Sequence, residues 1–260
     1  YKVDAHLSAV VGSFPTKIDA YRALKLGVPA APDAETLVRE YMTDFGTAVA
    51  AGIEIVPAKS GEAMFPVTDN SVAVVTGGGS GIGRAVAERL SQGGWTVVLA
   101  GRSMSTLKET KELLGDGECL CVQTDVTVEK EVEDLFRLVD SKYGRVDLLF
   151  NNAGVNSAPA MVETVLFSDF ERVLKTNVSG PFLCARTAMS MMARRGGGRI
   201  INNGSISAHV PRPGSACYTT SKHALLGLTK CIALDGRALN VACGQIDFGN
   251  VVSEMSRATN

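Results

Sequence analysis

A glycine-rich run between an apolar strand pattern and a helix pattern constrains the fold of this chain more than any other feature. The run is Thr76-Gly77-Gly78-Gly79-Ser80-Gly81-Ile82-Gly83, and it follows Val72-Ala73-Val74-Val75. Glycines at such a junction let the backbone approach a pyrophosphate, and the helix behind them presents free N–H groups and the positive end of its dipole. Glycine spacing alone is weak evidence, but this context predicts a dinucleotide-binding turn, with a purely structural tight turn as the alternative. The predicted ligand-binding residues of the turn are Gly77, Ser80, Gly81, Ile82 and Gly83.

Strand and helix patterns alternate regularly after residue 70. Apolar strand patterns cover Ser71–Val75, Trp95–Ala100, Cys119–Gln123, Val146–Phe150, Arg199–Ile201 and Asn240–Cys243. Helical patterns run from the glycine turn to about Gln92 and then over Met104–Leu114, Val128–Tyr143, Phe170–Ala193 and Ser215–Leu234. The strands are apolar on both faces, as buried parallel strands are. The alternation therefore predicts an α/β fold with a doubly wound parallel sheet of the Rossmann type.

Residues 1–70 do not join this alternation, so we predict two parts: an N-terminal extension over 1–70 and a catalytic, dinucleotide-binding domain over 71–260. Asp33 is placed to cap a helix that carries an apolar residue at every fourth position (Leu37, Tyr41, Phe45 and Val49). The extension is therefore partly helical. It either packs on the main domain or on a partner subunit, or it acts as a lid or a targeting region.

Bulk composition excludes several function classes. The 260 residues have a net charge of −1, which does not favour nucleic acid or an anionic membrane as a partner. No apolar stretch reaches the roughly 18 residues of a spanning helix, and no secretory signal is visible. The six cysteines show no CxxC pair and no metal-ligand spacing. We therefore expect a cytoplasmic protein with reduced thiols and no metal site.

A second spacing points to proton transfer. Tyr218 and Lys222 are four residues apart in a helical pattern, so their side chains share one helix face. A phenol with a pKa near 10 is a poor base at neutral pH, but a neighbouring ammonium group favours the phenolate and lowers that pKa. Taken alone, a tyrosine and a lysine at this spacing are usually solvent-exposed residues with no catalytic role. Together with the glycine turn it predicts general acid/base chemistry.

The end of the second strand bears on the choice of cofactor. A carboxylate at this point would bind the adenosine ribose and repel a 2′-phosphate, but position 101 is a glycine. Arg102 instead offers a fork of hydrogen-bond donors suited to a phosphate. The alternative interpretation is that Arg102 only faces solvent. We therefore favour NADP(H) over NAD(H). Asp125, after the third strand, either accepts from the adenine amino group or caps the following helix.

These motifs together resemble the short-chain dehydrogenase/reductase family of the single-domain type. The resemblance covers residues 70–247 and rests on Thr76–Gly83, Asp125-Val126, Asn151-Asn152-Ala153-Gly154, Asn177, Ser205 and Tyr218-x3-Lys222.

The resemblance implies a role for each matching residue. Tyr218 is the general acid/base, Lys222 binds the nicotinamide ribose and favours the phenolate, and Ser205 hydrogen-bonds the substrate oxygen. Asn177 holds a water that links Lys222 to solvent. Further cofactor contacts are implied at Val126, Asn152, Ala153, Gly154 and Ile246.

The C-terminal part departs from the family pattern. A Pro-Gly pair, an aliphatic residue and a threonine are usual after the last core strand, whereas this chain reads Cys243-Gly244-Gln245-Ile246-Asp247-Phe248. Ile246 keeps the aliphatic place, but the contacts to the nicotinamide are open. Only 38 residues follow Lys222, fewer than a substrate-covering segment and a last strand usually need. Three alternatives stay open: further residues lie outside the given sequence, the site is open, or residues 1–70 replace the missing cover.

The resulting functional hypothesis is an oxidoreductase that transfers a hydride between NADP(H) and a small carbonyl compound or secondary alcohol. The main alternative is a dinucleotide-binding scaffold or regulatory protein with little turnover, and a rearrangement or dehydration at the same site is a weaker one. The resemblance also implies a homodimer or homotetramer assembled through Phe170–Ala193 and Ser215–Leu234.

Overall fold

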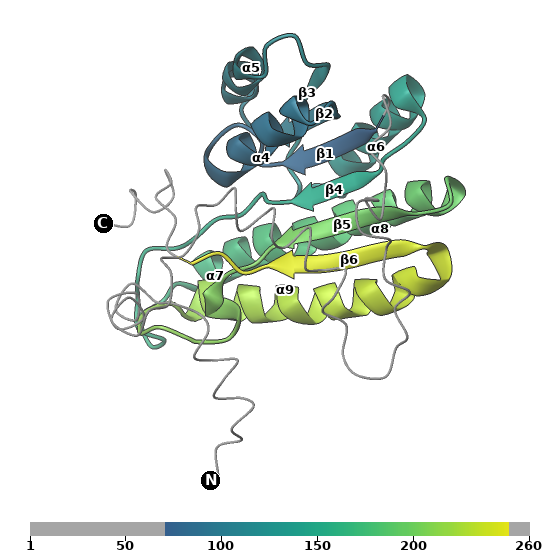
Figure 1. Ribbon diagram of the computed structural model, residues 1–260. Coiled ribbons are helices and arrows are strands. Elements are labelled where there is room, and N and C mark those ends of the chain that lie inside the picture. Colours follow the sequence, from purple (N-terminus) through teal and green to yellow (C-terminus); the bar gives the residue numbers. More distant parts are fainter. Residues whose placement is uncertain (1–70, 250–260) are drawn as a thin grey trace, which may run out of the picture. The chain divides into compact units, whose positions relative to one another are not determined.

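Six parallel strands form the central sheet of the computed structural model, which describes residues 71–249 (Figure 1). The strands are β1 (Val72–Thr76), β2 (Thr96–Gly101), β3 (Cys119–Gln123), β4 (Leu148–Asn151), β5 (Gly198–Asn203) and β6 (Val241–Ile246). Their order in the sheet is β3-β2-β1-β4-β5-β6, and every neighbouring pair is parallel. The order reverses direction between β1 and β4, which is where a doubly wound sheet opens a crevice for a ligand. The predicted doubly wound fold is confirmed.

Helices cover both faces of this sheet. They are α4 (Gly81–Gln92), α5 (Met104–Leu113), α6 (Glu129–Tyr143), α7 (Phe167–Leu174), α8 (Gly180–Arg194) and α9 (Ala216–Asp235). Helices α4 and α5 contribute Ala87 and Leu107 to the apolar core on one face. Helices α6, α8 and α9 contribute Phe136, Ala188 and Ile232 to the core on the other. The chain thus folds as three layers, helix on sheet on helix.

Strand β1 lies at the centre and is buried on both faces. Val72 and Val74 join the core beneath α6 and α8, whereas Ala73 and Val75 join the core beneath α4 and α5. All four residues are at most 1% exposed. A strand without a solvated face has to be apolar throughout, which is why the sequence shows an uninterrupted run here rather than an alternation.

The long helix predicted over Phe170–Ala193 is interrupted. The structure has α7, then a π-helical turn over Lys175–Ser179, then α8. A π turn holds more residues than an α turn and is frequent at functional sites. The apolar periodicity persists on both sides of the interruption, so the sequence pattern read as one helix.

The predicted extension over residues 1–70, with its helix after Asp33, lies outside the described residues. Within the described range, no helix combines the length and apolar character that crossing a bilayer requires.

Candidate functional site

A cavity of about 890 Å³ lies at the carboxyl ends of the strands and collects most of the predicted site residues. Its lining includes the following predicted residues: Gly77, Ser80, Gly81, Ile82, Arg102, Asp125, Val126, Asn152, Ala153, Gly154, Ser205, Tyr218 and Lys222. This volume is in the range of small-molecule and cofactor sites. Three predicted residues, Gly83, Asn177 and Ile246, are not part of the lining.

The glycine turn is shaped by close contacts with its neighbours. Gly77 has a φ of +63°, and a Cβ atom there would lie 2.9 Å from Asn152 Nδ2. A Cβ at Gly79 would lie 2.4 Å from Thr106 Oγ1. Ser80 occupies the N-cap position of α4, yet its side chain makes no capping hydrogen bond. The N-terminal end of α4 therefore faces the cavity without a side-chain cap, as an anion-binding helix end requires.

Gly83 serves the packing of this turn rather than the cavity wall. A Cβ at this position would lie 2.2 Å from the carbonyl oxygen of Gly77. Gly83 does not border the cavity, and its contact with a ligand stays a prediction. Its missing side chain lets α4 start close enough to β1 for the rest of the turn to form.

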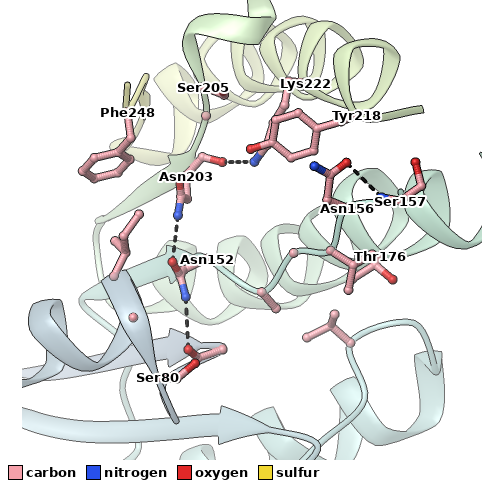
Figure 2. A pocket seen from close by; sticks show the side chains of 18 of the residues that line it. Ser80, Asn152, Asn156, Ser157, Thr176, Asn203, Ser205, Tyr218, Lys222 and Phe248 are labelled. Atoms are coloured by element: carbon pink, nitrogen blue, oxygen red, sulfur yellow. Dashed lines mark hydrogen bonds between the residues drawn. The ribbon is translucent and has the colours of Figure 1, made fainter. Parts of the chain in front are cut away.

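Asn152 also holds the glycine turn. Its Nδ2 donates to the carbonyl oxygens of Thr76 (2.9 Å) and Gly77 (3.1 Å). Its Oδ1 accepts from Asn203 Nδ2 (2.7 Å) (Figure 2). The side chain thus links the ends of β1 and β5. It borders the cavity, but its hydrogen bonds stabilise the fold of the cavity rim.

Asn177 lies in the π-helical turn and is only 1% exposed. Its Nδ2 donates to Val155 O (2.9 Å) and Ser221 Oγ (3.0 Å), and its Oδ1 accepts from Val155 N (2.8 Å). Both amide hydrogens are used, and the side chain fastens the segment after β4 to α9. That Asn177 also holds a water between Lys222 and solvent stays a prediction.

Tyr218 and Lys222 lie one turn apart near the N-terminal end of α9, where both reach the cavity (Figure 2). Lys222 Nζ lies 5.4 Å from the centre of the Tyr218 ring and donates to Asn203 O at 2.6 Å. Ser205 enters from the segment after β5, where its Oγ accepts from Ser207 N at 3.1 Å. Two chain segments, α9 and the segment after β5, therefore bring a phenol, an amine and a hydroxyl to the same wall.

Burial is the largest influence on the pKa values of Lys222 and Tyr218. It lowers the pKa of Lys222 from 10.5 to about 8, partly opposed by the charge of Asp247. It also raises the pKa of Tyr218, whereas a hydrogen bond with Ser205 and the charge of Arg212 act in the other direction. The sequence predicted a lowered phenol pKa, and this is wrong for the chain by itself. The desolvation of the phenolate outweighs the hydrogen bond with Ser205 and the attraction of the Arg212 charge.

The opposite end of the cavity carries Arg102 and Asp125. Arg102 is exposed and forms no ion pair with another residue in the 71–249 range. Asp125 Oδ1 accepts from Thr127 N (2.9 Å), and Asp125 N donates to Glu131 Oε2 (2.7 Å). Of the two interpretations left open for Asp125, its hydrogen bonds favour a local turn before α6, although the residue also borders the cavity.

At the C-terminal end of the site, Ile246 does not border the cavity, and its cofactor contact stays a prediction. Ile246 packs against the apolar cluster on the α4 side of the sheet, because side chains alternate along β6 and Cys243 occupies the other face. Phe248 and Gly249 border the cavity instead. Sequence reasoning also missed Asn156, Ser157 and Thr176, which line the cavity from the segment after β4 and the π-helical turn. These polar residues belong to no motif, so only the fold reveals them.

In the described part of the chain, no three His, Cys, Asp or Glu side chains gather closely enough to hold a metal ion. All six cysteines are free thiols.

Comparison with known proteins agrees with this geometry. The family model described as short chain dehydrogenase matches residues 71–260. An uncharacterized oxidoreductase of Thermotoga maritima is 39% identical over 168 residues, which are 64% of this chain and 65% of the relative. A 3beta-hydroxysteroid dehydrogenase of Mediterraneibacter gnavus is 36% identical over 182 residues, which are 68% of this chain and 65% of the relative. The chain thus covers slightly less than two thirds of the length of these two relatives.

A solved structure shows the same fold. The 3-ketoacyl-(acyl-carrier-protein) reductase from Brucella melitensis, complexed with NADH, superposes with a TM-score of 0.69 at 30% sequence identity. The superposition covers 71% of this chain and 77% of the reductase. The fold, the glycine turn, the Tyr218–Lys222 pair and the family match lead to one conclusion: the chain belongs to the short-chain dehydrogenase/reductase family.

Proposed function

We propose that the chain is an oxidoreductase that transfers a hydride between NADP(H) and a small carbonyl compound or secondary alcohol, with Tyr218 as the general acid/base. The observation that carries this proposal is the convergence of Tyr218, Lys222 and Ser205 on the cavity that the glycine turn also lines. A dinucleotide held by the turn and a substrate beside the phenol would share one cavity.

The residues present fit a nicotinamide dinucleotide. Gly77 and Gly79 have no room for side chains, and the uncapped start of α4 suits a pyrophosphate. Arg102 supplies donors for a 2′-phosphate at the outer end, and Lys222 supplies an ammonium group for ribose hydroxyls at the inner end. When bound, the cofactor provides or accepts the hydride.

Tyr218 and Ser205 would both act on the oxygen of the substrate, Tyr218 as proton donor and Ser205 as hydrogen-bond donor. Because burial raises the pKa of Tyr218, the phenol is neutral at physiological pH and able to donate a proton to a carbonyl oxygen. The Ser205 hydroxyl would stabilise negative charge that develops on the same oxygen. Lys222, with a pKa of about 8, is mostly charged at neutral pH and favours the phenolate that remains after donation. These charge states favour the reductive direction.

The same buried amine argues against the scaffold alternative. Lys222 is 6% exposed, and keeping a charged amine there lowers the stability of the fold. A protein that only binds a dinucleotide has no need of an acid/base tyrosine beside it.

The test measures NADPH and NADH oxidation with a panel of small ketones and aldehydes, using the Tyr218→Phe variant and the matched Tyr143→Phe variant. We expect turnover to be lost in Tyr218→Phe and kept in Tyr143→Phe, while both bind the cofactor, as followed by its fluorescence. If the unchanged protein and both variants all bind the cofactor and none of them turns over a substrate, the scaffold alternative is established.

The cofactor preference has its own test. The Arg102→Ala variant is expected to raise the KM for NADPH far more than the KM for NADH, because only NADPH carries the 2′-phosphate. The Arg237→Ala variant, which removes an exposed arginine outside the cavity lining, serves as the matched control. Equal effects of Arg102→Ala on both cofactors would remove the basis for preferring NADP(H).

We further propose that the chain forms a homodimer or homotetramer through α8 and α9. Phe182 on α8 is 46% exposed and Leu234 on α9 is 57% exposed, although both are large apolar side chains. A subunit interface would remove this apolar surface from water.

A further inference from the structure

A carboxylate that no motif predicted lies directly behind Ser205. Asp247 Oδ1 accepts from Ser205 N (2.9 Å) and from Gln245 Nε2 (2.7 Å). Asp247 Oδ2 lies 2.7 Å from His209 Nε2. Asp247 and His209 are not part of the cavity lining, whereas Ser205 is. Asp247 therefore touches the serine from the side that faces away from the cavity.

Gly204 makes this contact possible. A Cβ atom at Gly204 would lie 2.0 Å from Asp247 Oδ1 and 2.5 Å from Gln245 Cγ. The segments after β5 and β6 are also joined through their backbones, since Gly204 N donates to Ile246 O at 2.8 Å. The carboxylate therefore occupies the space that any other residue at position 204 would fill.

Gln245 extends the contact to the helix that carries Tyr218 and Lys222. Thr229 Oγ1 on α9 donates to Gln245 Oε1 at 3.1 Å. Thr229 follows Lys222 by seven residues, or about two helical turns, so the two residues share a helix face. A continuous set of hydrogen bonds thus runs from α9 through Gln245 and Asp247 to the backbone of Ser205.

The carboxylate also acts through its charge. The negative charge of Asp247 raises the pKa of Lys222 and of Tyr218. The other charge that acts on the phenol is Arg212, which lowers its pKa, and the titratable group that faces the carboxylate itself is His209. Asp247 therefore holds the Ser205 backbone by a hydrogen bond and acts on the Tyr218 phenol and the Lys222 amine electrostatically.

We propose that Asp247 is a positioning residue that fixes Ser205 against Tyr218 and maintains the charge balance of the acid/base pair. This inference rests on the proposed function of the site. Asp247 has two separable properties here: its Oδ1 acceptor holds the Ser205 backbone, and its negative charge acts on Tyr218 and Lys222.

Two substitutions separate these properties. Asp247→Ala removes both, and we expect kcat to fall about 10²-fold while the Kd for NADPH stays nearly the same, because a displaced serine weakens the reaction step but not the dinucleotide contacts. Asp247→Asn keeps the acceptor and removes the charge, so most of kcat should return at the optimum pH. The alkaline limb of its pH–rate profile should move to lower pH, because the phenol ionises more easily without the carboxylate.

Gly204→Ala tests the same contact without changing the carboxylate. The added methyl group would displace Asp247 from Ser205, so the variant should resemble Asp247→Ala in kcat and in its unchanged Kd for NADPH. Asp116→Asn, an exposed carboxylate between α5 and β3, is the matched control and should behave like the unchanged protein. Thermal unfolding of each variant shows whether it is folded at the assay temperature.

A spectroscopic experiment needs no substrate and so remains informative if no panel compound is turned over. The ultraviolet absorbance of tyrosinate is followed against pH, and Tyr218 is isolated as the difference from the Tyr218→Phe variant. The Tyr218 midpoint should be lower in Asp247→Asn than in the unchanged protein. An unchanged midpoint, or an Asp247→Ala variant with unchanged kcat, would overturn the positioning role. Turnover that survives in Tyr218→Phe would instead overturn the proposed function.

Discussion

Replacing Lys222 with methionine should make the protein more stable at neutral pH while abolishing its activity. Lys222 is 6% exposed, and burial holds its pKa at about 8, compared with 10.5 for an ordinary lysine. Since each pKa unit is equivalent to about 1.4 kcal/mol, the charged amine reduces the free energy of unfolding by about 3 kcal/mol at pH 7. Methionine removes the charge, fills a similar volume and loses the hydrogen bond to Asn203 O, which is worth about 1 kcal/mol. The net expectation is a gain of about 2 kcal/mol at pH 7.

The pH dependence gives the sharper test. Below about pH 8 the amine carries its proton in both the folded and the unfolded state, so the full penalty applies. Between about pH 8 and 10.5 the folded state has released this proton and the unfolded state still holds it, so Lys222 makes stability rise with pH by up to about 1.4 kcal/mol per pH unit. Above pH 10.5 the amine is neutral in both states and the penalty is absent.

Urea unfolding at pH 7, 8.5 and 10 measures this difference directly. The stability advantage of Lys222→Met should be greatest at pH 7 and should shrink toward pH 10. Lys230→Met, which removes an exposed lysine from the same helix, is the matched control and should show no such trend. A Lys222→Met variant that is less stable at pH 7, or whose advantage is the same at pH 7 and pH 10, would refute the reasoning.

Three further substitutions test the glycine turn, the π-helical turn and the proposed subunit interface. Gly83→Ala should weaken NADPH binding strongly, as measured by fluorescence titration, because its Cβ would lie 2.2 Å from Gly77 O, and unchanged affinity would contradict the packing argument. Asn177→Ala removes three buried hydrogen bonds and should lower the free energy of unfolding in urea by about 2–4 kcal/mol; a loss of less than about 1 kcal/mol would show that these bonds are easily replaced. Phe182→Glu places a charge on an exposed apolar site of α8 and should shift sedimentation toward smaller species, whereas an unchanged distribution would exclude that helix from the interface.

The fold was predictable because its core pattern is local. Each central strand is short, apolar on both faces and followed by an amphipathic helix, as Val72-Ala73-Val74-Val75 and α4 illustrate. The sequence cannot show that the helical pattern around Asn177 contains a π turn, because the apolar residues on either side still recur at helical spacing. That turn depends on the contacts of Asn177 with Val155 and Ser221, which only the folded chain brings together.

The site was predictable to the extent that its residues lie at strand ends or share a helix face. Tyr218 and Lys222 share a face of α9, and the glycine turn follows β1, so both could be placed from spacing alone. Asp247 could not be connected with Ser205, because they are 42 residues apart and meet through the register of β5 with β6. The direction of the Tyr218 pKa shift was also inaccessible, since it follows from burial, which a sequence does not report.

The π-helical turn has a consequence for how the two halves of this long helical segment meet their neighbours. Helix α7 contacts α9, whereas α8 packs chiefly against α6, β4 and β5 and less extensively against α9. One residue corresponds to about 100° of rotation in an α-helix, so deleting a single residue from Lys175–Ser179 would restore regular backbone hydrogen bonding only by turning one half about its axis. That rotation would detach either α7 from α9 or α8 from the sheet. The extra residue therefore rotates α7 and α8 relative to each other so that each helix turns its packing face toward its own neighbours. The irregular backbone at this point preserves both sets of contacts.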